Sequence, residues 1–250
     1  MRLDPLLKRL RDRLEYLQLS GTAKAVLRDR LTYLGPAKFR RLERALREIV
    51  QNDVPGDVVE FGIALGGSGI VLAKTAIKAG REFHGFDVFG MIPPPTSEKD
   101  DAKSKQRYEV IAAGKSKGIR GDRYYGYRPH LYEEVCASFA HHGVAVDGKQ
   151  VFLHKGFFET TLPYYDAASV ALAHIDCDWY DPVRCCLAAV AERLSVGGAI
   201  ILDDYHDYGG CRRATDEFLA ANSAFELQDG ANVLLLKRSL TDGASFKTLS

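Results

Sequence analysis

The 250-residue sequence lacks the long apolar runs of a membrane protein. None approaches the ~20 residues that a membrane-spanning helix needs, and the first residues lack the apolar core of a signal peptide. Strong charge of one sign is also missing, because the formal net charge is +1. Such a balance gives no global attraction to nucleic acid or to a membrane surface. We therefore expect no nucleic-acid partner and no membrane span.

Cysteines are few and are not spaced as a disulfide framework or a C-x-x-C metal site. The chain has 5 of them, an odd number, in a composition with 46% hydrophobic and 27% charged residues. That balance is typical of an ordinary globular chain. The cysteine usage favours a reduced, cytoplasmic setting.

The most informative stretch runs from Val58 to Gly69. A short apolar run before the first glycine predicts a buried strand over residues 57–61. Apolar residues after the last glycine predict a helix that begins near Ser68 and is closed by Gly80. The glycines permit a sharp turn and close approach to a bound molecule. The start of the helix would present free amide hydrogens there.

Two familiar phosphate-binding patterns are missing from this turn, the G-x-G-x-x-G fingerprint and the Gly-Lys-Ser/Thr ending of a P-loop. Instead the chain reads Gly62-x-x-x-Gly66-Gly67-Ser68, with Glu60 two residues before the first glycine. This pattern resembles the first motif of class I S-adenosylmethionine (SAM)-dependent methyltransferases. The resemblance implies that Glu60, Gly62, Gly66 and Ser68 belong to a SAM site. An ordinary strand–helix joint is the alternative.

Two further residues are candidates for the same cofactor site. A second predicted strand ends at Asp87, and ligands of open α/β sheets bind at the carboxyl ends of strands. A carboxylate there can accept both hydroxyl protons of a ribose, although a cap or turn role is the alternative. Phe157 follows the third predicted strand, at residues 149–155. It would either cover an adenine face or pack in the core.

The order of elements predicts the fold class. Five strands alternate with helices, and a terminal hairpin spans residues 225–237. This order predicts an α/β fold with a doubly wound, mostly parallel, seven-stranded sheet. Residues 1–52 predict an N-terminal helical extension, with helices at 4–19, 23–33 and 36–52. Its basic surface is a partner surface, through which the chain would form a homo-oligomer, or a lid, or else a solvated face.

The main domain is predicted over residues 53–240, and a polar, mobile tail over 241–250. Residues 90–128 show the least regular pattern and predict a lid or insertion beside the site. Its tyrosines, Tyr124, Tyr125 and Tyr127, lie among basic residues that could grip a sugar ring and a phosphate-bearing group. A solvated loop with local packing is the alternative. The basic residues are Lys115, Lys117, Arg120, Arg123 and Arg128.

Three aspartates follow two strands that should lie side by side. Asp176 ends the fourth predicted strand, and Asp203 and Asp204 end the fifth. Carboxylates brought that close would repel one another and raise their pKa values. A hard divalent cation with oxygen ligands removes this conflict, so we predict a magnesium site. Separate capping roles are the alternative, as expected for Asp178 and for Asp181 before Pro182.

The ordered series of motifs is similar to the macrocin O-methyltransferase (TylF-like) family over about residues 50–240. The motifs are Glu60-Phe-Gly-x-x-x-Gly-Gly-Ser, Gly85-Phe-Asp87, Lys155 to Pro163, His174-Ile-Asp-Cys-Asp-Trp-Tyr180 and Asp203 to Ala214. The resemblance implies a class I methyltransferase fold, SAM as methyl donor, magnesium on Asp176, Asp203 and Asp204, and often a sugar hydroxyl as acceptor. Residues 90–128 depart from the family, so the acceptor stays open.

The resulting hypothesis is a SAM- and Mg²⁺-dependent O-methyltransferase that acts on a sugar hydroxyl of a nucleotide sugar, glycoside or glycan. Asp176 could accept the proton as well as bind metal. His206 is a second base candidate, or else an exposed loop histidine. Other hypotheses are a methyltransferase of a non-sugar vicinal diol or catechol, a nucleotide-dependent Rossmann enzyme that modifies sugars, and a non-catalytic SAM-binding oligomer.

Overall fold

The computed structural model describes residues 5–239. The tail predicted for residues 241–250 lies outside them. Within the described range, every helix is too short or too polar to cross a membrane.

A seven-stranded sheet forms the centre of the described chain, in the order β3-β2-β1-β4-β5-β7-β6. The first five strands pair in parallel, and β7 is antiparallel to both of its neighbours. The predicted doubly wound, mostly parallel sheet is therefore confirmed. The strands are β1 (Asp57–Phe61), β2 (Phe83–Asp87), β3 (Val151–Lys155), β4 (Val170–Ile175), β5 (Leu194–Leu202), β6 (Phe225–Gln228) and β7 (Val233–Lys237).

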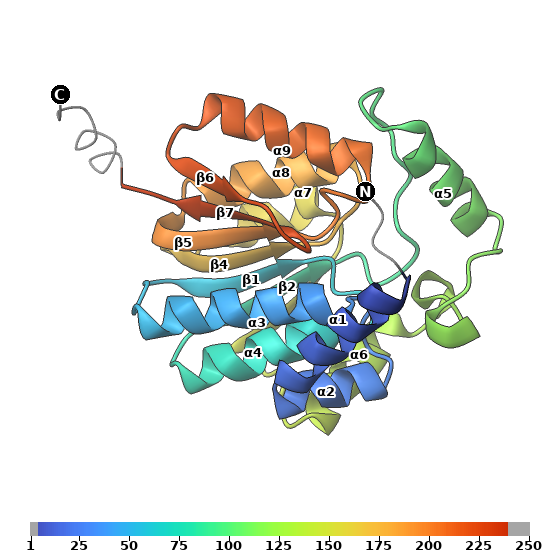
Figure 1. Ribbon diagram of the computed structural model, residues 1–250, viewed down its shortest axis with the longest axis horizontal. Helices are drawn as coiled ribbons and strands as arrows, with labels where there is room; N and C mark the ends of the chain where they lie inside the picture. Colours follow the sequence, from blue (N-terminus) through green and yellow to red (C-terminus); the bar gives the residue numbers. More distant parts are fainter. Residues whose placement is uncertain (1–4, 240–250) are drawn as a thin grey trace.

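Helices cover both faces of the sheet, as Figure 1 shows. One layer contains α3 (Pro36–Gln51), α4 (Gly67–Lys78) and α6 (Leu131–His141), with α1 (Pro5–Gln18) and α2 (Gly21–Arg28) outside it. The other layer contains α7 (Phe158–Thr161), α8 (Tyr180–Ala191) and α9 (Gly209–Ala221). Alternate strand residues bury apolar side chains against each layer, as a sheet covered on both faces requires.

The N-terminal extension contains the three predicted helices. The α3 helix buries Phe39, Leu42 and Leu46 in the core on its side of the sheet. The α2 helix ends at Arg28, earlier than predicted, because Arg30 takes a left-handed φ of 59°. The domain boundary after residue 52 stays a prediction, as does oligomerisation through these helices. Among the α1 side chains that the structure describes, Leu10, Leu14 and Leu17 are exposed.

The insertion at residues 90–128 is more ordered than its sequence indicated. It contains the helix α5 (Ala102–Ala112) and two short 3-10 turns, Ile119–Gly121 and Tyr125–Tyr127. Asp101 caps the helix by accepting the backbone N–H of Ser104 at 2.8 Å. Helix α5 stands beyond the two helical layers, at one end of the molecule (Figure 1).

Candidate active site

A cleft with two lobes opens at the carboxyl ends of the parallel strands. The lobes have volumes of about 870 Å³ and about 970 Å³. The residues shared by their walls are Gly62, Asp87, Tyr125, Asp176, Asp178 and Trp179. The two lobes are therefore adjoining parts of one cleft, which we call the apolar lobe and the polar lobe.

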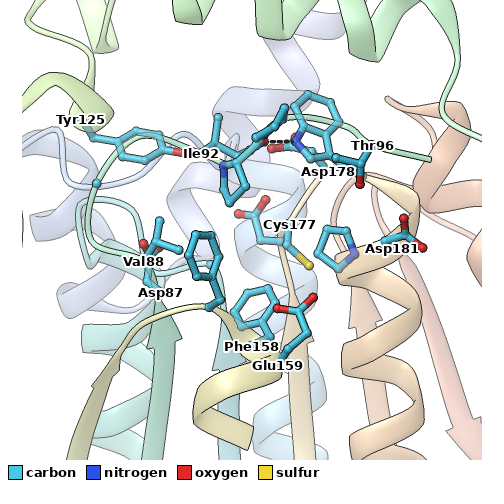
Figure 2. Close-up of a pocket in the computed structure, with 18 residues that line it drawn as sticks. Asp87, Val88, Ile92, Thr96, Tyr125, Phe158, Glu159, Cys177, Asp178 and Asp181 are labelled. Carbon is cyan, nitrogen blue, oxygen red and sulfur yellow. Dashed lines mark hydrogen bonds between the residues drawn. The ribbon is translucent and has the colours of Figure 1, made fainter. Parts of the chain in front are cut away.

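The apolar lobe is lined mainly by carbon. Figure 2 shows Val88 and Ile92 on one side of the cavity, Phe158 on another and Cys177 between them. Phe157, predicted to contact a cofactor, also lines this lobe, and 55% of its surface is exposed. The insertion closes the wall, because the indole N–H of Trp179 donates to the carbonyl of Pro93 at 2.9 Å. This lobe suits a flat, largely apolar group.

The turn after β1 is fixed by the close approach of Gly62 to the backbone of Asp176 and by hydrogen bonds to Asp87. Gly62 has a φ of 92°, and a Cβ there would lie 1.9 Å from the carbonyl oxygen of Asp176, so a side chain cannot fit. Asp87 accepts the backbone N–H groups of Ile63 and Ala64 at 2.7 and 2.9 Å, and that of Phe89 at 2.6 Å. Burial raises the pKa of Asp87 despite these bonds. Asp87 thus holds the turn, and its contact with a ribose stays a prediction.

Three other predicted cofactor residues do not line either lobe in the described structure. Glu60 is fully buried, and its carboxylate lies 2.8 Å from Nδ1 of His174. A Cβ on Gly66 would lie 3.0 Å from the ring of Phe139. Ser68 is buried in the first turn of α4. The glycine turn is therefore covered largely by the chain itself, and direct contacts from these three residues stay predictions.

The structure brings together the three aspartates predicted to bind metal. One carboxylate oxygen from each of Asp176, Asp203 and Asp204 lies within 4.8 Å of the others. They converge because β4 and β5 pair in parallel, with Ile175 opposite Leu202. Burial and the charges of Asp203 and Asp204 raise the pKa of Asp176 well above its usual range. Burial and Asp203 raise the pKa of Asp204 to about 7.

Asp178 belongs to this cluster, which corrects its predicted role as a cap. It lines both lobes and has a left-handed φ of 60°. Its backbone N–H donates to Asp204 at 3.3 Å. Burial, then the charges of Asp204 and Asp203, raise its pKa well above the usual range. The D-x-D spacing from Asp176 was the signal in the sequence.

The cap of α8 is also different from the prediction. Trp179 occupies the N-cap position, and Asp100 of the insertion accepts the N–H of Tyr180 at 2.8 Å. Asp181, predicted as the cap, lies inside the first turn. A carboxylate distant in sequence thus supplies the acceptor that the local pattern had assigned to Asp181.

Lys38 of α3 brings the N-terminal extension into the site. Its ammonium group donates to the Asp203 carboxylate at 2.9 Å and to the Asp207 carboxylate at 2.8 Å. Burial alone would lower the pKa of Lys38, but Asp203 and Asp207 raise it overall. Sequence reasoning missed this residue because 165 positions separate it from Asp203.

His206, the second predicted base, is not brought to the cleft. Its Nε2 lies 2.9 Å from the Asp229 carboxylate in the β6–β7 turn. It lines neither lobe in the described structure.

The insertion supplies one wall of the polar lobe, with partly different residues from those predicted. Tyr124 and Tyr125 line it, whereas the hydroxyl of Tyr127 donates to the carbonyl of Ile111. Arg128 pairs with Glu134 at 2.7 Å and is not part of the lining of the described lobe. The lining cations are Lys38, Lys103 and Arg107. The predicted basic loop residues, Lys115, Lys117, Arg120 and Arg123, are outside the lining of the described lobe.

The strand order and the cleft at the strand ends define a class I methyltransferase fold. The solved structure of the O-methyltransferase NovP superposes with a TM-score of 0.68 at 26% identity, over 84% of this chain and 82% of that one. That of CalS11, a calicheamicin methyltransferase, gives a TM-score of 0.57 at 19% identity, over 94% of both chains.

The model of the family described as Macrocin-O-methyltransferase (TylF) matches residues 20–226, so the chain belongs to this family. The family resemblance is thereby confirmed, and the chain is a SAM-dependent O-methyltransferase. It is 26% identical to demethyldecarbamoylnovobiocin O-methyltransferase of Streptomyces niveus, over 76% of this chain and 68% of that protein. It is 27% identical to mycinamicin III 3''-O-methyltransferase of Micromonospora griseorubida, over 75% and 69% respectively.

Proposed function

We propose that this protein transfers the methyl group of SAM to a hydroxyl group of a sugar, with a magnesium ion held by three aspartates. The observation that carries the proposal is the convergence of Asp176, Asp203 and Asp204 in the polar lobe, where Asp176 also lines the apolar lobe. Relatives support a sugar acceptor. One, from Streptomyces olivaceus, is named for 4'-O-methylation of a dimethoxy-rhamnosyl tetracenomycin and is 27% identical over 72% of this chain.

The polarity of each lobe indicates which of the two substrates it would bind. The apolar lobe, with Val88, Phe157 and Phe158, suits the adenine of the methyl donor. The polar lobe, with tyrosines and carboxylates, suits a hydroxylated acceptor. Because the lobes meet at Gly62, Asp176 and Asp178, the reacting atoms would meet there.

The donor set fits magnesium. Its ligand atoms are all carboxylate oxygens, within 4.8 Å of one another, and hard divalent cations prefer oxygen ligands. Burial and then the neighbouring carboxylates raise the pKa values of Asp176 and Asp204, and the charge of Lys38 offsets this only in part at Asp204. When bound, the cation would supply positive charge that lowers the pKa of a nearby hydroxyl.

Asp178 is the residue best placed to receive the proton. It lines both lobes, and it is not one of the three proposed metal ligands. In the proposed step the acceptor oxygen forms a bond to the methyl carbon as the carbon–sulfur bond breaks. S-adenosylhomocysteine is released, and the hydroxyl proton passes to the Asp178 carboxylate. Asp176, named above as a possible base, would serve as a ligand.

A labelled-methyl transfer screen tests the proposal. The protein would be incubated with methyl-labelled SAM and a panel of nucleotide sugars and glycosides, with magnesium or with a chelator. We expect label on at least one sugar, with the chelator abolishing transfer and magnesium restoring it. Transfer only to catechols would overturn the sugar assignment, and full turnover in the chelator would overturn the magnesium assignment.

A further inference from the structure

The polar lobe contains one cation that the described protein leaves without an oxygen partner. Its walls carry three basic side chains, Lys38, Lys103 and Arg107. Lys38 is bound to Asp203 and Asp207. Lys103 donates to the backbone carbonyl of Asp207, and its ammonium lies 4.7 Å from the ring centre of Tyr208. Both lysines are therefore committed to contacts within the chain.

Arg107 differs from both lysines. In the described part of the chain, its guanidinium forms no ion pair or hydrogen bond, and it lies over the ring of Tyr124, 5.6 Å from the ring centre. That ring is only 3% exposed, so it forms a fixed platform. A guanidinium stacked on an aromatic face keeps its N–H groups available in the plane of the fork. Arg107 is thus oriented and half-buried beside the cleft.

The aspartates of the lobe make no hydrogen bond or ion pair with this cation in the described chain. Asp203 and Asp207 are paired with Lys38, and Asp87 is bound by three backbone N–H groups. The remaining carboxylates are Asp176, Asp178 and Asp204. Arg107 forms no ion pair with them in the described chain, although its charge partly offsets the rise in pKa that burial causes at Asp178. A guanidinium binds carboxylate and phosphate groups through two parallel hydrogen bonds, which makes them its preferred ligands.

We propose that the acceptor carries an anionic group, a carboxylate or a phosphate, and that Arg107 binds this group in the polar lobe. This inference rests on the proposed function and specifies its substrate class. Tyr33, Tyr124 and Tyr208 line the same lobe and would contact the sugar ring. The insertion would then bind the acceptor through Arg107 of α5, while the aspartates at the strand ends would take part in methyl transfer.

Binding titrations with protein loaded with magnesium and S-adenosylhomocysteine test the inference. The probes are methyl glucuronide, UDP-glucose and neutral methyl glucoside. The wild type should bind at least one anionic probe about tenfold or more tightly than methyl glucoside, as expected for a charge-assisted contact. The probe with the larger preference identifies the anion as carboxylate or phosphate.

The variant Arg107→Met should lose this preference, and Arg107→Lys should fall between it and the wild type because lysine lacks the fork. Lys105→Met is the matched control, since Lys105 is exposed on the same helix and outside the lobe's lining. It should bind like the wild type. Equal binding of charged and neutral probes by the wild type, or an unchanged preference in Arg107→Met, would overturn the inference.

The methyl-transfer screen separates this result from failure of the proposed function. Label transferred equally well to methyl glucoside by the wild type and by Arg107→Met would overturn the anionic acceptor and leave sugar methylation in place. A screen in which no sugar receives label would overturn the proposed function itself.

Discussion

Two clusters of ionisable side chains lie on the same sheet and differ in what surrounds them. The aspartate cluster, Asp176, Asp178, Asp203 and Asp204, lies at the carboxyl ends of β4 and β5 and lines the cleft. The histidine cluster, His84 and His154 with Asp57, Glu82 and Tyr165, lies on β2, β3 and the segments beside them. Asp57, Glu82 and His84 also place three possible ligand atoms within 4.8 Å.

The histidine cluster is packed by aromatic rings. His154 stacks on Phe86 at 4.3 Å, and His84 stacks on Phe152 at 4.5 Å. The rings of His84 and His154 also share a contact of 3.1 Å between nitrogen atoms. Burial and the neighbouring His84 lower the pKa of His154 to about 4. The neutral form of the His154 ring is therefore favoured, whereas the aspartates hold several carboxylates together beside the cleft.

The two clusters differ in their access to a cavity, because the aspartates line the polar lobe whereas the histidines are packed by aromatic rings. Ionisable groups with shifted pKa values that line a cleft are candidates for a functional site. The aspartate cluster is therefore the proposed metal site, whereas the histidine cluster packs the sheet. Substitutions in each cluster can break that assignment.

The largest effect is expected from Asp203→Asn. Loss of one carboxylate should lower methyl transfer by about a thousandfold or more, because a proposed metal ligand is removed. Mn²⁺ binding followed by electron paramagnetic resonance should weaken in parallel. His84→Phe is the matched substitution in the other cluster and should keep both properties within about twofold of the wild type. A reversal of these two results would contradict the comparison.

Asp178→Asn separates chemistry from metal binding inside the aspartate cluster. Removal of a proton acceptor should lower kcat by about a hundredfold to ten-thousandfold. Mn²⁺ affinity should change little, since Asp178 is not one of the three proposed ligands. Steady-state kinetics and metal titration on the same preparation check this. Loss of Mn²⁺ binding in Asp178→Asn would show instead that Asp178 is a metal ligand.

The sequence allowed the aspartate triad to be predicted because parallel pairing alone brings successive strand ends together. It could not place Lys38, whose contact with Asp203 depends on how α3 packs across the sheet. Helix α5 was missed because only Ser104 and Ile111 are buried in it, so it has almost no apolar periodicity. The orientation of His206 could not be predicted either, because it depends on the loop that contains it and on its contact with the distant Asp229.

A smaller effect is expected from Lys38→Met. The lysine holds Asp203 and Asp207, so its loss should leave Asp203 less well oriented and weaken Mn²⁺ binding by about tenfold. Lys38→Arg should restore most of the affinity by keeping a donor near both carboxylates. Calorimetric metal titration, independent of turnover, measures both variants. Tighter metal binding by Lys38→Met would show instead that the ammonium competes with the cation.

The smallest effect concerns stability in the histidine cluster. The folded-state pKa of His154 is about 4, below the ordinary value of about 6.5. Between these pH values His154 binds more protons in the unfolded chain than in the folded one. The free energy of unfolding therefore decreases as the pH falls through this range. His154→Phe should remove this loss. The free energy of unfolding of the variant should therefore fall by on the order of 1–2 kcal/mol less than that of the wild type between pH 7.5 and pH 4.5. Urea unfolding at both pH values checks it, and an equal pH dependence would contradict it.

Crystals grown with Mn²⁺ and S-adenosylhomocysteine offer the most direct measurement, through anomalous scattering at the manganese edge. The account predicts one strong peak between Asp176, Asp203 and Asp204, at about 2.0–2.3 Å from an oxygen of each. Manganese bound by Asp57, Glu82 and His84 with no peak among the three aspartates would contradict the account.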